Sequence, residues 1–237
     1  MNNDDFIQDK DIMFTVASNT ISITILFLPR YITENTVSSD GWITIVFGGL
    51  IAILLGWLLA KIAVAFPNES FLSFASYLVS KPVAITLSIL FIFQYIVISS
   101  FQMREIAVLS HEYLFDRTPL EVVCLAFILV VIYGVSGSRI AIFRLNILFF
   151  PFVIGGLILL IIAPIGAIKL ENLLPVFETD ISGILAGTTS SLNAFLGFSI
   201  VLFYISLIKQ PKQAAKMTVL GILWPFTFYI IIFIVCV

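Results

Sequence analysis

The sequence predicts an all-α integral membrane protein with seven predicted transmembrane helices. Of its 237 residues, 60% are hydrophobic and only 11% are charged, which leaves too few polar side chains to cover a soluble globular protein. Its apolar stretches approach or exceed the roughly 20 residues that a helix needs to cross a bilayer. Two of them, the first and the sixth, also carry many hydroxyl and amide side chains. That pattern is typical of transporter-like folds that hold a small solute at mid-membrane.

The spans follow from apolar length, read against the residues that break helices. In chain order they are predicted at 12–30, 42–65, 83–109, 119–136, 145–168, 183–208 and 217–237. The breakers between them are Asp40-Gly41, Pro67-Asn68, Lys81-Pro82, Thr118-Pro119, Ser136-Gly137-Ser138 and Gln210-Pro211. Asp40, Ser80 and Thr118 each precede a span and are candidates for its N-cap.

The distribution of Lys and Arg predicts the orientation in the membrane. With a cytoplasmic N-terminus, eight basic residues fall on the cytoplasmic side and four on the other, so we expect the N-terminus inside. The eight are Lys10, Lys61, Lys81, Arg139, Arg144, Lys209, Lys212 and Lys216, and the four are Arg30, Arg104, Arg117 and Lys169.

The two ends of the chain carry their own signals. The first dozen residues contain four aspartates and one lysine, unlike the basic start of a secretory signal, so no cleavable signal is expected. The last residues, 233–237 (FIVCV), lie within a hydrophobic run. We therefore expect the chain to be a fragment of something longer, with one membrane domain over residues 1–237.

Composition and motifs exclude several classes of function. Cys124 and Cys236 both lie inside apolar runs, so a disulfide framework is not expected. A net charge of -2 without a basic segment gives no reason to expect nucleic acid as a partner. The single histidine, His111, is expected to be solvated at a helix end. We find no nucleophile and base pair, metal-ligand cluster or phosphate-binding loop, so neither enzyme activity nor a cofactor or metal is expected.

The first span carries a dense polar cluster. Thr15, Asn19 and Ser22 fall on one helical face by the i, i+4, i+7 rule. The hydroxyls have an alternative reading, because Ser and Thr in membrane helices often bond to a carbonyl one turn earlier or pack against a neighbouring helix. An amide in hydrocarbon needs partners for two donors and an acceptor, so Asn19 is the stronger site candidate. The cluster consists of Thr15, Ser18, Asn19, Thr20, Ser22 and Thr24.

The sixth span repeats this pattern, with Thr189, Asn193 and Gly197 on one face. Gly197 is the natural place for the helix to loosen, since glycine tolerates a broken backbone. A groove of small residues for helix packing is the alternative reading. Two such clusters five spans apart match the separation expected of a five-span inverted repeat.

The third span offers a weaker polar face through Tyr95, Ser99 and Gln102. A tyrosine in mid-span can close one side of a solute cavity, although such residues more often pack between helices with the hydroxyl on a carbonyl. Arg104 and Glu105 follow near the end of this span. Adjacent residues on a helix do not face each other, so these charges pair elsewhere or reach the interface.

Four segments of the chain resemble the B subunit of spore germinant receptors, the spore-permease branch of the amino acid/polyamine/organocation transporter superfamily. Each segment is short, but their order and spacing cover nearly the whole chain. They are residues 25–30 (ILFLPR) with 40–43 (DGWI), 66–67 (FP) with 70–72 (SFL), 104–105 (RE), and 171–176 (ENLLPV) with 195–198 (FLGF).

The resemblance implies a ten-helix fold of two inverted five-helix repeats (5+5) with broken helices 1 and 6. Residues 1–168 would be the first repeat and 183–237 part of the second. It further implies an amino acid-like germinant as ligand, A and C subunits as partners, and a place in the lipid bilayer of the spore inner membrane. The solute site expected between the broken helices comprises Asn19, Ser22, Ile23, Thr24, Tyr95, Asn193, Phe195, Gly197 and Phe198.

The chain departs from the family pattern in three ways. Ser22 and Thr24 stand where glycines are usual, Ser199 replaces the usual Glu after Gly-Phe, and spans eight to ten are missing. The leading hypothesis is a germinant-sensing, permease-like membrane subunit. An amino acid transporter of the same fold and a truncated fragment that binds nothing are the alternatives.

Overall fold

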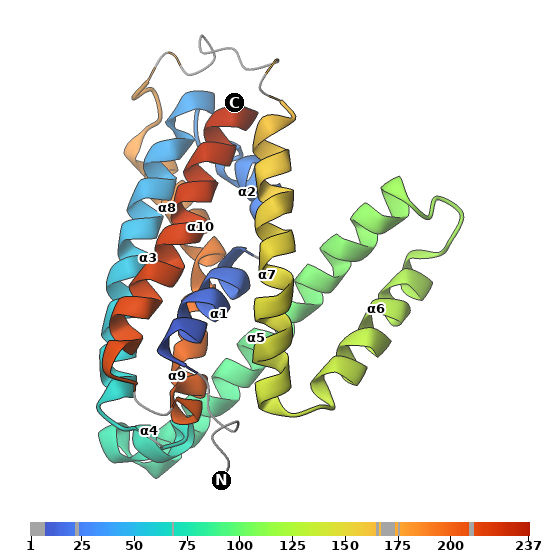
Figure 1. Cartoon of the computed structure of the whole chain (residues 1–237). Coiled ribbons are helices and arrows are strands. Elements are labelled where there is room, and N and C mark those ends of the chain that lie inside the picture. Colours follow the sequence, from blue (N-terminus) through green and yellow to red (C-terminus); the bar gives the residue numbers. More distant parts are fainter. Residues whose placement is uncertain are drawn as a thin grey trace. The chain divides into compact units, whose positions relative to one another are not determined.

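The computed structural model describes residues 8–21, 24–67, 69–164, 166, 174, 176–208 and 211–237, and these fold almost entirely into helices (Figure 1). The chain divides into two compact units, Met1–Asn68 with Leu145–Val237 and Glu69–Arg144. The expectation of an all-α membrane protein is confirmed, because long apolar helices dominate the described residues.

The larger unit contains most of the helices. In chain order they are α1 (Asp9–Ile21), α2 (Thr24–Thr33), η2 (Ser38–Asp40), α3 (Gly41–Val64), α7 (Arg139–Ile162, in this unit from Leu145), α8 (Ile181–Ala194), η5 (Leu196–Ile200), α9 (Val201–Tyr204), η6 (Ile205–Leu207), η7 (Pro211–Gln213) and α10 (Ala214–Cys236). The smaller unit holds α4 (Phe71–Val79), α5 (Lys81–Tyr113) and α6 (Leu120–Val135).

Length and hydropathy identify the membrane-spanning helices. Among the described residues, four helices are long and apolar enough to cross a membrane: Gly41–Val64, Lys81–Tyr113, Ile140–Ile162 and Pro211–Cys236. Two bent helix pairs bring the number to six if each pair is one span, and they coincide with the first and sixth predicted spans. The remaining predicted range, 119–136, coincides with α6, which has only 16 residues.

Helix α3 packs against both α8 and α10, and it does so through small residues. A Cβ added at Gly48 would lie 2.8 Å from the Cβ of Ser191 on α8, and one added at Gly49 would lie 2.2 Å from the Phe226 ring on α10. Because Gly48 and Gly49 have no side chain, the axes of these helices can approach each other closely, as is common in membrane helix bundles. The buried small residues of α3 are Gly41, Gly48, Gly49, Ala52, Gly56, Ala60 and Ala63.

Asp40 and Ser80 are at the expected N-cap positions but make no capping hydrogen bond, and Thr118 is not at an N-cap position. Asp40 is at the N-cap position of α3, but its side chain makes no capping hydrogen bond because it bonds another segment, described below. Ser80 has a φ of 112°, outside the extended region that lets an N-cap side chain reach back to the helix. Thr118 lies one residue too early, since Pro119 is at the N-cap position of α6.

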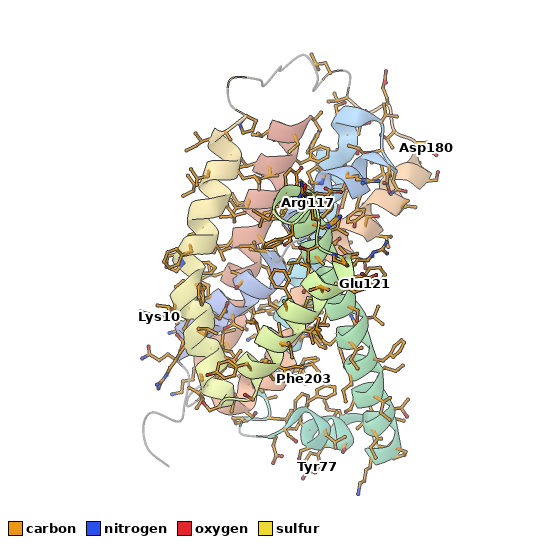
Figure 2. All side chains as sticks on the ribbon, turned by 90° about the vertical axis from the view of Figure 1, so that its right-hand side faces the viewer. Lys10, Tyr77, Arg117, Glu121, Asp180 and Phe203 are labelled. Carbon is orange, nitrogen blue, oxygen red and sulfur yellow. The ribbon has the colours of Figure 1, made fainter. Side chains whose placement is uncertain are left out.

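The smaller unit is a helical hairpin with a short helix at its start. The Phe71 ring of α4 meets the Phe91 ring of α5 edge to face, at 5.4 Å between ring centroids. At the other end of α5, Nδ1 of His111 lies 2.9 Å from the carbonyl oxygen of Thr118, so this histidine joins α5 to the α6 connection. Figure 2 labels Arg117 and Glu121 on that connection and the first turn of α6.

Candidate solute site

Both polar-rich spans are broken helices. The axes of Lys10–Ile21 and Thr24–Thr33 differ by 51°, and those of Ile181–Ala194 and Leu196–Leu207 differ by 41°. At the second break the hydrogen-bond pattern changes from α to 3-10: the amide of Phe195 donates to Leu192 at 3.0 Å and that of Phe198 to Phe195 at 3.3 Å. Figure 2 labels Asp180, which precedes α8, and Phe203, which lies in α9 after the break.

The end of α1, just before the first break, lies against the second break. Nδ2 of Asn19 donates a 2.9 Å hydrogen bond to the carbonyl oxygen of Gly197. A Cβ on Gly197 would lie 2.7 Å from the backbone nitrogen of Thr20 and 2.8 Å from the carbonyl oxygen of Asn19. Glycine is therefore required at position 197 by the close approach of two backbones. The predicted site residues Asn19 and Gly197 are thus brought into direct contact.

A residue that the sequence analysis missed links the two breaks. Tyr229 of α10 is 1% exposed, and its hydroxyl lies 2.6 Å from the carbonyl oxygen of Thr20 and 3.4 Å from that of Ala194. Its ring packs edge to face on the buried Phe195 ring, with centroids 5.0 Å apart. A single tyrosine inside an apolar run gave no signal beyond its need for a hydrogen-bond partner.

These carbonyls lie at the C-terminal ends of two helices. A carbonyl in an α-helix normally accepts from the amide four residues later, and the last carbonyls of a helix lack that donor. Thr20 and Ala194 belong to the last turns of α1 and α8, and we call the place where these two helix ends meet the crossing. Both helices present their negative C-terminal ends there. The Thr20 hydroxyl is also buried, at 1% exposure, and makes no hydrogen bond within the described residues.

Part of the sixth-span cluster serves helix packing. Ser191 lies 3.2 Å, hydroxyl to hydroxyl, from Thr44 of α3, and Thr44 lies 2.7 Å from the carbonyl oxygen of Gly41. The hydroxyl of Thr189 donates to the carbonyl of Leu185 in the preceding turn. The alternative reading of hydroxyls as packing groups therefore holds for these two side chains.

Asp40 attaches the segment before α8 to the α2–α3 connection. Its carboxylate, fully buried at 0% exposure, accepts hydrogen bonds from the amides of Phe177 at 2.6 Å and Thr179 at 2.8 Å. The Thr179 hydroxyl accepts from the amide of Val37 at 2.9 Å. Burial raises the pKa of Asp40, but the amide donors of Thr179 and Phe177 outweigh that effect, so its pKa lies below the usual value. We call these contacts the Asp40 strap.

The other predicted site residues are distributed differently. Phe195 and Phe198 are buried in the larger unit, and Thr24 is half-buried at the start of α2. Asn193 is exposed on α8. Tyr95 is on α5, in the smaller unit. Ser22 and Ile23 lie outside the described residues.

The chemistry at the crossing is that of neutral dipoles. The groups in contact there are an amide, a phenol, hydroxyls and main-chain carbonyls. Within the described part of the chain, no group of three or more His, Cys, Asp or Glu side chains is placed to hold a metal ion.

Comparison with known proteins identifies the family. The family model described as "Spore germination protein" matches residues 6–237. The chain is 38% identical to spore germination protein GerLB of Bacillus cereus over 240 residues, covering 99% of this chain and 63% of GerLB. It is 28% identical to spore germination protein YndE of Bacillus subtilis (strain 168), covering 90% of this chain and 59% of YndE.

A third relative agrees with these two. Identity to spore germination protein A2 of Bacillus subtilis (strain 168) is 28%, over 94% of this chain and 61% of that protein. The chain thus spans about three fifths of the length of the curated relatives it matches. No solved structure matches it. Because the family model covers nearly the whole sequence, the chain belongs to the spore germination protein family of membrane permeases.

Proposed function

We propose that the chain is a germinant-sensing B subunit of a spore germinant receptor and binds an amino acid-like solute where its two broken helices cross. The family supports the receptor role. The observation that carries the solute site is the direct contact of the two breaks, from Asn19 to Gly197. The A and C subunits of the receptor would be its partners, and the spore inner membrane its location.

A zwitterionic solute matches the polarity of the crossing. The carbonyls of Thr20 and Ala194 at the helix C-terminal ends attract an ammonium group. The first turn of α2, which starts at Thr24, has amide donors without helical acceptors and attracts a carboxylate. A solute that bridges these groups would stabilise one arrangement of the two breaks over another, and partner subunits would respond to that change.

The order of helices supports an inverted-repeat origin. In each half of the larger unit a broken pair precedes a continuous apolar helix: α1 and α2 before α3, and α8 with η5 before α10. All four groups pack in one bundle. The 5+5 repeat, with residues 1–168 as its first half, is our proposal for the complete fold.

The solute site is tested with Asn193→Ala. Asn193 is exposed, so its loss should leave stability unchanged, whereas a lost hydrogen bond to the solute should weaken binding by about tenfold. Binding of the twenty common amino acids to the chain in lipid nanodiscs is measured by calorimetry. Thr189→Ala, one turn earlier and also exposed, is the matched control and should bind as the parent does. Equal affinity in both variants would remove Asn193 from the site, and no binding to the parent would contradict the proposed function.

The orientation of the chain is tested by cysteine labelling, in a background where Cys124 and Cys236 are replaced by serine. Glu178 and Lys212 are both exposed and lie on either side of the sixth span. From the eight-to-four distribution of basic residues, Lys212→Cys should react with an impermeant thiol reagent only from the cytoplasmic side. Glu178→Cys should react only from outside, and the reverse pattern would overturn the orientation.

A further inference from the structure

The two hydrogen bonds of Tyr229 differ in length, so the carbonyl acceptors at the crossing are not both fully hydrogen-bonded. A phenol has one proton to donate, yet its oxygen faces two carbonyls, at 2.6 Å for Thr20 and 3.4 Å for Ala194. The shorter distance is a strong hydrogen bond and the longer one is marginal. The Thr20 hydroxyl beside them makes no hydrogen bond within the described residues. More acceptor capacity is therefore buried here than the protein itself fills.

The electrostatics of the same point favour a cation. α1 and α8 have 13 and 14 residues, and the carbonyls that Tyr229 contacts lie in the last turn of each. Each helix C-terminus carries the negative end of a macrodipole, and a low dielectric strengthens its attraction for positive charge. A primary ammonium group has three N–H donors and a full charge, so it can satisfy both carbonyls where a phenol satisfies one.

We propose that Tyr229 is a latch that competes with the ammonium group of the solute for the carbonyls of Thr20 and Ala194. This proposal rests on the proposed function and specifies how its site is regulated. In the solute-free protein the hydroxyl holds the two breaks together. A solute with a primary ammonium group displaces the hydroxyl, and the energy needed for that displacement sets the concentration at which the receptor responds.

Tyr229 contacts the carbonyls of Thr20 and Ala194 through its hydroxyl and Phe195 through its ring, and none of these three partners is a charged side chain. The carboxylate of Asp40 is engaged with Phe177 and Thr179 in the Asp40 strap. The latch therefore acts through hydrogen bonding and helix dipoles.

The test is Tyr229→Phe in the full 237-residue chain, reconstituted in nanodiscs. The ring and its contact with Phe195 remain, while the competing hydroxyl is lost. An amino acid that binds the parent should bind this variant about fivefold more tightly, because one hydrogen bond no longer has to be broken. Tyr133→Phe, which removes the hydroxyl of a tyrosine that is 84% exposed, is the matched control and should leave affinity unchanged.

Two further ligands test whether the N–H donors of the ammonium group, and not its charge alone, compete with Tyr229. N,N,N-trimethylglycine keeps the positive charge but has no N–H donors, so its affinity should not increase in the variant. Sodium chloride, compared with tetraethylammonium chloride, tests whether a metal cation alone takes the carbonyls. If Tyr229→Phe bound trimethylglycine more tightly than the parent does, or bound sodium alone more tightly, the role of the ammonium donors would be overturned.

The outcomes separate the latch from the site. If the parent binds an amino acid and Tyr229→Phe binds it equally or more weakly, the latch is wrong and the solute site stands. If no amino acid binds the parent, both proposals fail. Should the variant not fold, 3-fluorotyrosine placed at position 229 of the otherwise unchanged chain gives a ¹⁹F NMR signal. A saturating amino acid should shift that signal, and an unchanged signal would contradict the latch.

Discussion

Gly197→Ala is expected to lower the free energy of unfolding by about 3 kcal/mol, at the upper end of the cost of overpacking. The added methyl group would lie 2.7 Å from the backbone nitrogen of Thr20 and 2.8 Å from the carbonyl of Asn19. Backbone atoms in a packed helix cannot move aside as a side chain can, so α1 and η5 must separate. The hydrogen bond from Asn19 to Gly197 would lengthen with them. Denaturation of the purified chain in detergent measures the loss.

Gly155→Ala is the matched control for that substitution. Gly155 lies within α7, and a Cβ there would meet no heavy atom within 4 Å. Alanine is the better helix former by up to about 1 kcal/mol, so this variant should equal or exceed the parent in stability. Equal stabilities for Gly197→Ala and Gly155→Ala would show that the two breaks are not packed as described.

Asp40→Asn is expected to cost on the order of 3 kcal/mol of stability, since hydrogen bonds to a charged acceptor contribute about 1.5–3 kcal/mol each. The carboxylate accepts from the amides of Phe177 and Thr179, and one oxygen would become an NH₂ group that faces a donor. Asp180→Asn is the control. Asp180 accepts from Gly183 as the N-cap of α8, and asparagine caps as well as aspartate does.

The same variant should change the response to acid. The pKa of Asp40 is lowered in the folded chain, so its carboxylate stabilises the fold fully above the unfolded pKa, about 4. That contribution is lost as the pH falls through the folded pKa, which lies lower. The stability difference between the parent and Asp40→Asn should therefore be constant near neutral pH and shrink below about pH 4. A difference that persists or grows in acid would contradict the charged strap.

The fold was more predictable than the site because the two depend on different signals. Apolar length and helix breakers are local, and they predicted helices that coincide with α3, α5, α7 and α10. Gly197 was singled out as the point where the sixth span loosens, and η5 begins one residue before it, at Leu196. These properties need only neighbouring residues and the length of the bilayer.

Long-range partners were not predictable in the same way. Tyr229 is 209 residues from Thr20, and the pattern around it is uniformly apolar. Asp40 was assigned to a helix cap because that role needs only its own helix, whereas its actual partners lie 137 and 139 residues away. Asn193 shares a helical face with Gly197 by spacing, but in the structure Asn193 is exposed whereas Gly197 meets Asn19 directly.

The Asp40 strap also fixes the parity of the membrane crossings. Hydrogen bonds join Asp40 to Phe177 and Thr179, so the α2–α3 connection and the start of α8 lie on one side of the bilayer. A chain that returns to the side it left has crossed an even number of times. α3, α5 and α7 supply three crossings between those points, and α4 has only nine residues. We therefore expect the sixteen-residue α6 to be the fourth crossing, which a bilayer would accommodate by thinning locally around a short helix.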